Sequence, residues 1–136
     1  MTDKVYQLLY SPRQIDQQIG RINAKIRSLR DSLMLSGVRY DKDVVQSSPS
    51  DRMSAVIAEI DALEHKRDAL IGSRIHAVDA IEKAVNGLED DGEKTVLYMQ
   101  YIGCESMDEI AEELHYSRRS AYRLRAQALR SLDRQV

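Results

Sequence analysis

Apolar residues in the first third of the chain recur at the spacing of a helix that packs along another helix. Between residues 15 and 33, isoleucine or leucine returns at alternating intervals of four and three, which indicates a heptad seam. Ser11 and Pro12 predict the start of this helix, because proline suits the first helical position. Gly37 predicts its end. The seam consists of Ile15, Ile19, Ile22, Ile26, Leu29 and Leu33.

A second long apolar pattern follows the longest connection in the chain, at residues 37–50. Pro49 and Ser50 predict the start of a helix over about 51–88, which Gly72 weakens without ending. Its apolar side carries Met53, Val56, Ile57, Ile60, Leu63, Leu70, Ile71, Ile75, Val78, Ile81, Val85 and Leu88.

The two long helices are expected to form an antiparallel, coiled-coil-like hairpin. In this pairing Ile26 lies beside Ile60. The charged run at 64–68 lies opposite Ile19 and Gly20, where the missing side chain of the glycine leaves room. Residues 3–10 are expected to form one or two helical turns that dock onto the bundle. A two-helix hairpin leaves apolar residues uncovered, so we expect a homodimer through a four-helix bundle.

The pattern breaks at residues 89–92, and a helix over 93–102 follows, ended by Gly103. We therefore expect a helical hairpin for oligomerisation at 1–88 and a separate three-helix domain at 89–136. The expected fold class is all-α, because the chain lacks Phe and Trp and is rich in helix-forming residues.

The stretch from Ser106 to Leu132 predicts two short helices joined by a three-residue turn, which is a helix-turn-helix. Ser106 with Glu109 forms a capping box, and Ser117 can cap the second helix. The expected core residues are Met107, Ile110, Ala111 and Leu114 in the first helix and Ala121, Leu124, Ala128 and Leu132 in the second.

The face of the second helix opposite its core stripe is basic. In a helix-turn-helix the second helix enters the DNA major groove, where Arg and Gln suit base edges. Arg119 and Arg123 are the best candidates for base contact, whereas Tyr122 either contacts DNA or packs against Leu129. The predicted DNA-contacting residues are Arg118, Arg119, Ser120, Tyr122, Arg123, Gln127 and Arg130.

The net charge of −2 hides a strong local asymmetry. Residues 89–113 hold nine acidic residues and one basic residue, whereas residues 115–136 hold six basic residues and one acidic residue. Phosphate contact requires only a local basic surface. The charge distribution is therefore compatible with double-stranded DNA as the partner.

Other chemistry finds little support in the sequence. We see no nucleophile–base pair, no phosphate-binding glycine loop and no zinc spacing, so we expect neither enzymatic activity nor a cofactor. The single cysteine, Cys104, cannot form an intrachain disulfide. No apolar run approaches the ~20 residues of a membrane span, and no signal-peptide pattern is present, which predicts a cytoplasmic protein without membrane partners.

The stretch Val96–Leu132 resembles region four of bacterial sigma factors, and more closely the phage and prophage regulators of the ArpU and RinA type. The long paired helices upstream also resemble prophage proteins of this group. Sigma factors often have glycine in the turn where this chain has His115, which tolerates a left-handed backbone better than most residues. The matching positions are Tyr101, Gly103, Glu109, Ile110, Ala111, Ser117, Ala128 and Leu129.

This resemblance implies a sequence-specific transcriptional regulator of phage or prophage genes, with RNA polymerase as a further possible partner. Nothing here matches sigma region two, so the chain is not expected to act as a sigma factor by itself. Two alternatives stay open. One is a phage small terminase subunit for DNA packaging, and the other is a coiled-coil adaptor whose helix-turn-helix binds only protein.

Overall fold

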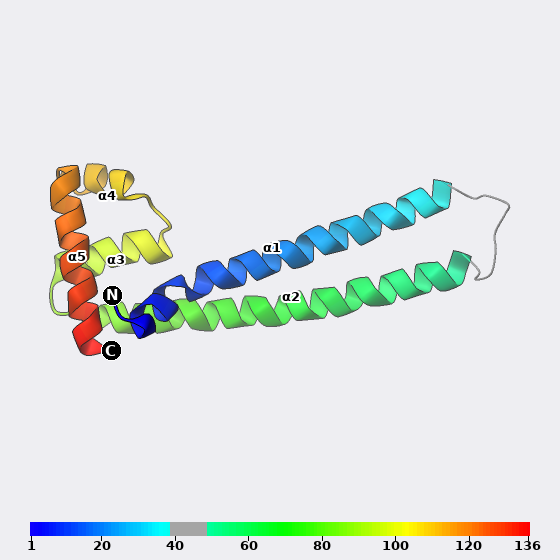
Figure 1. Ribbon diagram of the computed structural model, residues 1–136, viewed down its shortest axis with the longest axis horizontal. Coiled ribbons are helices and arrows are strands. Elements are labelled where there is room, and N and C mark those ends of the chain that lie inside the picture. Colours follow the sequence, from blue (N-terminus) through cyan, green and yellow to red (C-terminus); the bar gives the residue numbers. More distant parts are fainter. Residues whose placement is uncertain (39–48) are drawn as a thin grey trace. The chain divides into compact units, whose positions relative to one another are not determined.

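The computed structural model describes the backbone of residues 1–38 and 49–136 and the side chains of 1–35 and 50–136. Every regular element in these residues is a helix, which confirms the all-α prediction (Figure 1). The predicted connection falls mainly on residues 39–48, outside the described residues. The elements are α1 (Asp3–Val38), α2 (Pro49–Asn86), α3 (Asp91–Leu97), the π-helix η1 (Tyr98–Ile102), α4 (Met107–Glu113) and α5 (Arg118–Gln135).

The chain divides into two compact units, residues 14–73 and residues 1–13 together with 74–136. This division differs from the expected boundary after residue 88. The start of α1 and the end of α2 belong with the C-terminal helices, because Val5, Leu9, Ile81 and Val85 are buried in the same core as those helices.

The unit at residues 14–73 is a hairpin of α1 and α2 (Figure 1). Ile26 and Ile60, which we expected to pair, lie in one buried cluster together with Ile22. Polar contacts join the same two helices: Arg30 Nη2 lies 3.0 Å from Glu64 Oε1. The predicted hairpin is thus present in the structure.

The predicted reason why the hairpin accommodates the charged run at 64–68 was wrong. A Cβ built on Gly20 meets no atom within 4 Å, so the missing side chain does not make room for these charges. Partners on α1 accommodate the run instead, since Arg30 pairs with Glu64 and Arg67 Nη1 donates a 2.9 Å hydrogen bond to Asn23 Oδ1.

The predicted helix start at Ser11 and Pro12 was also wrong, because α1 begins at Asp3 and Pro12 lies inside it. Proline in a helix removes one backbone hydrogen bond. Burial of Val5 and Leu9, at 0% and 3% exposure, offsets that loss. Residues 3–10 are therefore helical and docked, as expected, but they form the first turns of α1.

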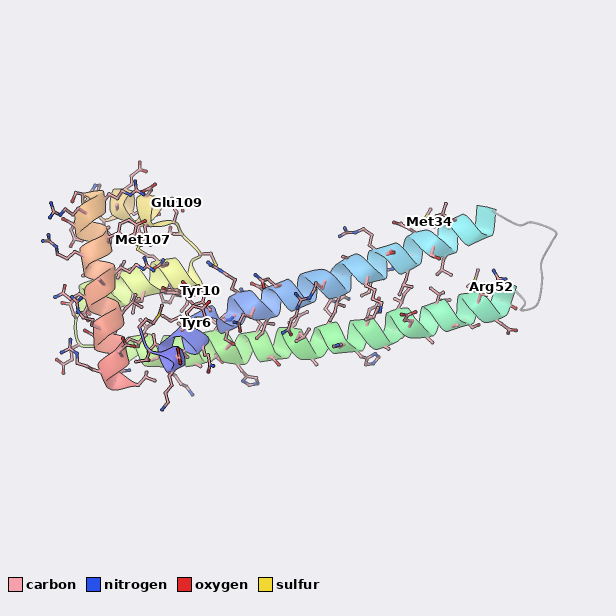
Figure 2. All side chains as sticks on the ribbon, viewed as in Figure 1. Tyr6, Tyr10, Met34, Arg52, Met107 and Glu109 are labelled. Carbon is pink, nitrogen blue, oxygen red and sulfur yellow. The ribbon has the colours of Figure 1, made fainter. Side chains whose placement is uncertain are left out.

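The second unit combines residues 1–13 with the C-terminal helices. Its core residues are Val5, Leu9, Ile81, Val85, Leu88, Val96, Leu97, Tyr101, Met107, Ile110, Ala111, Ala121, Ala128 and Leu132. Tyr6 and Tyr10, labelled in Figure 2, stack with ring centroids 4.5 Å apart, and Tyr10 meets Tyr101 edge-on at 5.7 Å. These contacts fix the start of α1 against η1.

The predicted helix over 93–102 is present but changes its geometry part-way. Asp90 caps α3 by accepting a 2.9 Å hydrogen bond from the Glu93 N–H. From Tyr98 the chain continues as a π-helix that ends at Gly103, whose N–H donates to Tyr98 O at 2.9 Å. A Cβ on Gly103 would lie 2.8 Å from Met99 O, so this close approach of backbone requires glycine.

Candidate nucleic-acid interface

Both helices of the helix-turn-helix begin at the predicted caps. Ser106 Oγ accepts a 3.2 Å hydrogen bond from the Glu109 N–H, and Ser117 Oγ accepts a 3.1 Å bond from the Ser120 N–H. Each serine has the extended backbone of an N-cap residue. Local sequence signals therefore set where α4 and α5 start.

The turn between α4 and α5 is closed by a Schellman motif. The Tyr116 N–H donates to Ala111 O at 2.9 Å, and the His115 N–H donates to Glu112 O at 3.2 Å. These two bonds satisfy carbonyls at the end of α4. His115 has φ 58°, which confirms the expectation of a left-handed backbone at this position.

The apolar faces of α4 and α5 pack in the core as predicted. Ile110, Ala121, Ala128 and Leu132 are fully buried, and Met107 and Ala111 are nearly so. Leu114 and Leu124 are partly buried against the same cluster. Two buried alanines on α5 allow it to pack closely in this core. One face of α5 is thereby fixed against the protein.

The opposite face of α5 is open to solvent and basic. The seven residues predicted to contact DNA are all exposed, and they lie within the first thirteen residues of this helix. They are Arg118, Arg119, Ser120, Tyr122, Arg123, Gln127 and Arg130. This face presents several N–H donors to solvent, the chemistry needed for phosphate and base-edge contacts.

Arg118 differs from the other arginines of this face because it has intramolecular partners. Its guanidinium carbon lies 5.8 Å from the centroid of the Tyr122 ring, and its Nε lies 3.4 Å from Asp108 Oδ1 on α4. A hydrogen bond with Tyr122 and the charge of Asp108 raise the pKa of Arg118. Sequence reasoning missed Asp108 as a partner, since only the α4–α5 packing brings it close.

Tyr122 remains 40% exposed despite its contact with Arg118. A ring exposed to this extent can contact a partner and can also pack in part against Leu129, so both alternatives stay predictions. The expected role of Tyr122 at the DNA surface is therefore compatible with its position.

Arg125 is not part of the exposed basic face of α5. It is half-buried, and both its Nε and the hydroxyl of Tyr101 are buried without a hydrogen-bond partner among the described residues. Burial raises the pKa of Tyr101, and the positive charge of Arg125 partly offsets this rise. Nothing in the sequence pattern distinguishes Arg125 from the exposed arginines of α5.

The exposed surface of α4 is acidic. Asp108, Glu109, Glu112 and Glu113 are all exposed. A hydrogen bond with Glu113 and the nearby carboxylate charges raise the pKa of Glu105, just before α4. Because carboxylates repel phosphate, this surface is unsuited to contact with the DNA backbone.

Metal-binding clusters and membrane spans are two other kinds of feature that bear on function. The described residues contain no group of three or more His, Cys, Asp or Glu side chains that could hold a metal ion. No described helix is both long and apolar enough to cross a membrane. Cys104 is exposed and has φ 56°.

Comparison with known proteins places the chain in a family. Neither the curated proteins nor the solved structures contained a match. A family model with the description "Protein of unknown function (DUF1492)" matches residues 34–133. The matched segment includes α2 and the entire helix-turn-helix. Because it covers more than half of the chain, the chain belongs to the DUF1492 family.

Proposed function

We propose that this protein is a sequence-specific, double-stranded DNA-binding regulator of phage or prophage transcription. One observation carries the proposal: α5 buries its apolar face in the core and exposes Arg119, Arg123, Gln127 and Arg130 on the other side. A helix held in this way after a capped helix and a tight turn is suited to insertion into the major groove. The likeness to the ArpU and RinA regulators supports the phage context.

The proposal assigns different roles to different arginines of α5. Arg119 and Arg123 lie in the N-terminal half of the helix, where base contacts concentrate. Arg130 lies near its C-terminal end and is suited to phosphate contact. The acidic surface of α4 is unsuited to phosphate and is available for a protein partner such as RNA polymerase.

Genome-wide mapping of bound DNA in a lysogenic host tests the proposal. Binding at a small number of promoter-proximal phage sites supports a regulator. Binding confined to a phage packaging site would instead favour the terminase alternative. Absence of specific DNA binding, also at low salt in vitro, would overturn the proposal and favour a protein-binding adaptor.

Two substitutions test the division of roles. Arg123→Ala is expected to relax sequence preference at one base position, at a cost of about 1–3 kcal/mol on the specific site. Arg130→Ala is expected to weaken specific and random DNA about equally and to lower the salt slope by about 1. Titration of labelled duplexes at several salt concentrations measures both effects.

Arg27→Ala is the matched control, because it removes the same charge from an exposed position on α1, far along the sequence from α5. Its affinity for specific DNA should equal that of the unmodified protein. If Arg123→Ala and Arg130→Ala alter affinity and specificity in the same way, base and phosphate contacts are not divided between them.

A further inference from the structure

The hairpin at residues 14–73 buries few apolar side chains. Among its described residues, Ile22, Ile26 and Ile60 are buried, while four other members of the α1 seam stay half-exposed. Long helices owe most of their stability to packing rather than to propensity. The hairpin therefore lacks the cover that a stable bundle needs.

The uncovered apolar surface lies on one side of α2. Met53, Ile57, Ile71 and Ile75 are 46%, 47%, 43% and 58% exposed. At 3.6 residues per turn, these four positions and Glu64 fall within about 40° of one another around the helix. They form one stripe along α2, hereafter the α2 stripe.

The α2 stripe is symmetric about its centre. Ile57 and Ile71 each lie seven residues from Glu64, and Met53 and Ile75 each lie eleven residues from it. When two copies of such a helix pack antiparallel with Glu64 at the crossing point, Ile57 meets Ile71 of the other copy and Met53 meets Ile75. Every apolar residue then meets an apolar residue, as an isologous two-fold contact requires.

We propose that a second copy of this chain covers the α2 stripe, in an antiparallel arrangement with the two-fold axis at Glu64. This goes beyond DNA binding and does not depend on it. A second copy fits this surface because each apolar residue of the α2 stripe then faces another apolar residue of the same stripe.

The charge at the centre is compatible with this arrangement. Two Glu64 side chains would approach each other at the axis, and unpaired carboxylates there would repel. Each Glu64 is already paired with Arg30 of its own chain at 3.0 Å, so two opposite pairs meet rather than two bare charges.

The available area is close to what a stable dimer needs. From Met53 to Ile75 the stripe extends about 33 Å at 1.5 Å per residue, and a contact two helix diameters wide would cover about 700 Å² per copy. Stable interfaces bury about 800 Å² per partner. The α2 stripe alone, one helix diameter wide, would cover about half of this area, so the contact must also take in residues of α1 to reach the size of a stable interface.

Disulfide trapping tests the position of the axis. In a Cys104→Ser background of the full chain, Glu64→Cys places two thiols at the crossing point. Helix axes 8–10 Å apart, with Cα atoms about 2.3 Å from each axis, put the facing Cα atoms about 3.4–5.4 Å apart, and the upper part of this range allows a disulfide. Glu64→Cys should give a covalent dimer under mild oxidation, whereas the control Ala62→Cys, exposed on another side of α2, should stay largely monomeric on non-reducing gels.

A charge-swap experiment tests the direction of pairing. Ile57→Glu should weaken the dimer at least tenfold in sedimentation equilibrium, and Ala62→Glu should leave the dimer constant unchanged. Combining Ile57→Glu with Ile71→Lys should restore most of the loss, because each introduced carboxylate then faces the introduced ammonium group of the other copy. In a parallel dimer these positions would not meet, and the double variant would not recover.

Circular dichroism on each variant separates loss of association from loss of helix. The proposal is overturned by a monomeric wild-type chain at micromolar concentration, by rings larger than a dimer, by equal trapping of the two cysteine variants, or by failure of the double variant to recover. None of these measurements uses DNA, so they can fail while DNA binding by α5 stands.

Discussion

Replacing His115 by glycine should stabilise the protein, although it removes most of a side chain. His115 is exposed and sits at φ 58° in the turn between α4 and α5. A left-handed backbone costs an L-residue roughly 1–2 kcal/mol, and glycine avoids this cost. Glycine also raises the conformational entropy of the unfolded chain, which lowers the unfolding free energy by about 0.5–1 kcal/mol. The net gain in unfolding free energy is therefore expected to be about 0.5–1 kcal/mol.

The physical reason lies in the backbone hydrogen bonds that hold His115 in place. Its N–H donates to Glu112 O, and the next N–H, of Tyr116, donates to Ala111 O, so the turn cannot relax without losing both bonds. Because the side chain is exposed, few contacts are lost on substitution. The result should thus follow backbone preference alone.

A series at this position makes the test strict. Stability, measured by urea titration with helix content as the signal, should fall in the order Gly, His and Val at position 115. Valine should cost more than about 1 kcal/mol relative to histidine, since a β-branched residue tolerates positive φ poorly. If valine proved as stable as glycine, the left-handed turn would not be the source of the strain.

Two further predictions concern glycine and pH. Gly72→Ala should raise the unfolding free energy by about 0.5–1 kcal/mol, because a Cβ at this position meets nothing within 4 Å. Gly103→Ala should lower the unfolding free energy, because its Cβ would lie 2.8 Å from Met99 O. Thermal melts of both variants measure these changes, and a change of the same sign in both variants would contradict the geometry. A 2.9 Å hydrogen bond from the Thr2 N–H holds the pKa of Asp133 below its ordinary value. The ionised carboxylate therefore contributes stability that is fully present above the unfolded pKa and is lost as pH falls through the lower, folded pKa. The stability difference caused by Asp133→Asn should accordingly be present at pH 6 and shrink as the pH falls through the folded pKa of Asp133.

Local signals in the sequence were sufficient to predict the helix-turn-helix. Ser106 and Ser117 cap their helices as predicted, because a cap depends only on residues within one turn. The apolar spacing of α4 and α5 correctly predicted their core faces, and hence which side of α5 is exposed. Geometry that follows from periodicity can be derived without tertiary information.

Features that depend on tertiary contact were not predictable in this way. Pro12 is a good local start signal, yet α1 extends past it because Val5 and Leu9 find a core made by residues more than seventy positions later. Likewise, the π-helix after α3 has no sequence signature of its own. Long-range burial decided where α1 begins.

In the candidate site, too, some features follow from periodicity and others depend on packing. Periodicity placed the seven exposed residues on one surface of α5, but it could not show that Arg118 pairs with Asp108 or that Arg125 is half-buried. Both features depend on how α5 packs against other elements. Which arginines are free to bind a ligand is therefore a property of the packing.

The charge arrangement around the turn constrains how DNA can approach. The acidic surface of α4 and the basic face of α5 meet at the Asp108–Arg118 pair, whose two side chains are both 72% exposed. Phosphate would compete with Asp108 for Arg118, so a duplex lying toward α4 gains one contact and meets four carboxylates. A duplex lying toward Arg123 and Arg130 meets arginines whose described contacts include no acid. In the proposed complex DNA should therefore lie over Arg119, Arg123 and Arg130 and away from the acids of α4, and such a local basic face is compatible with a net charge of −2.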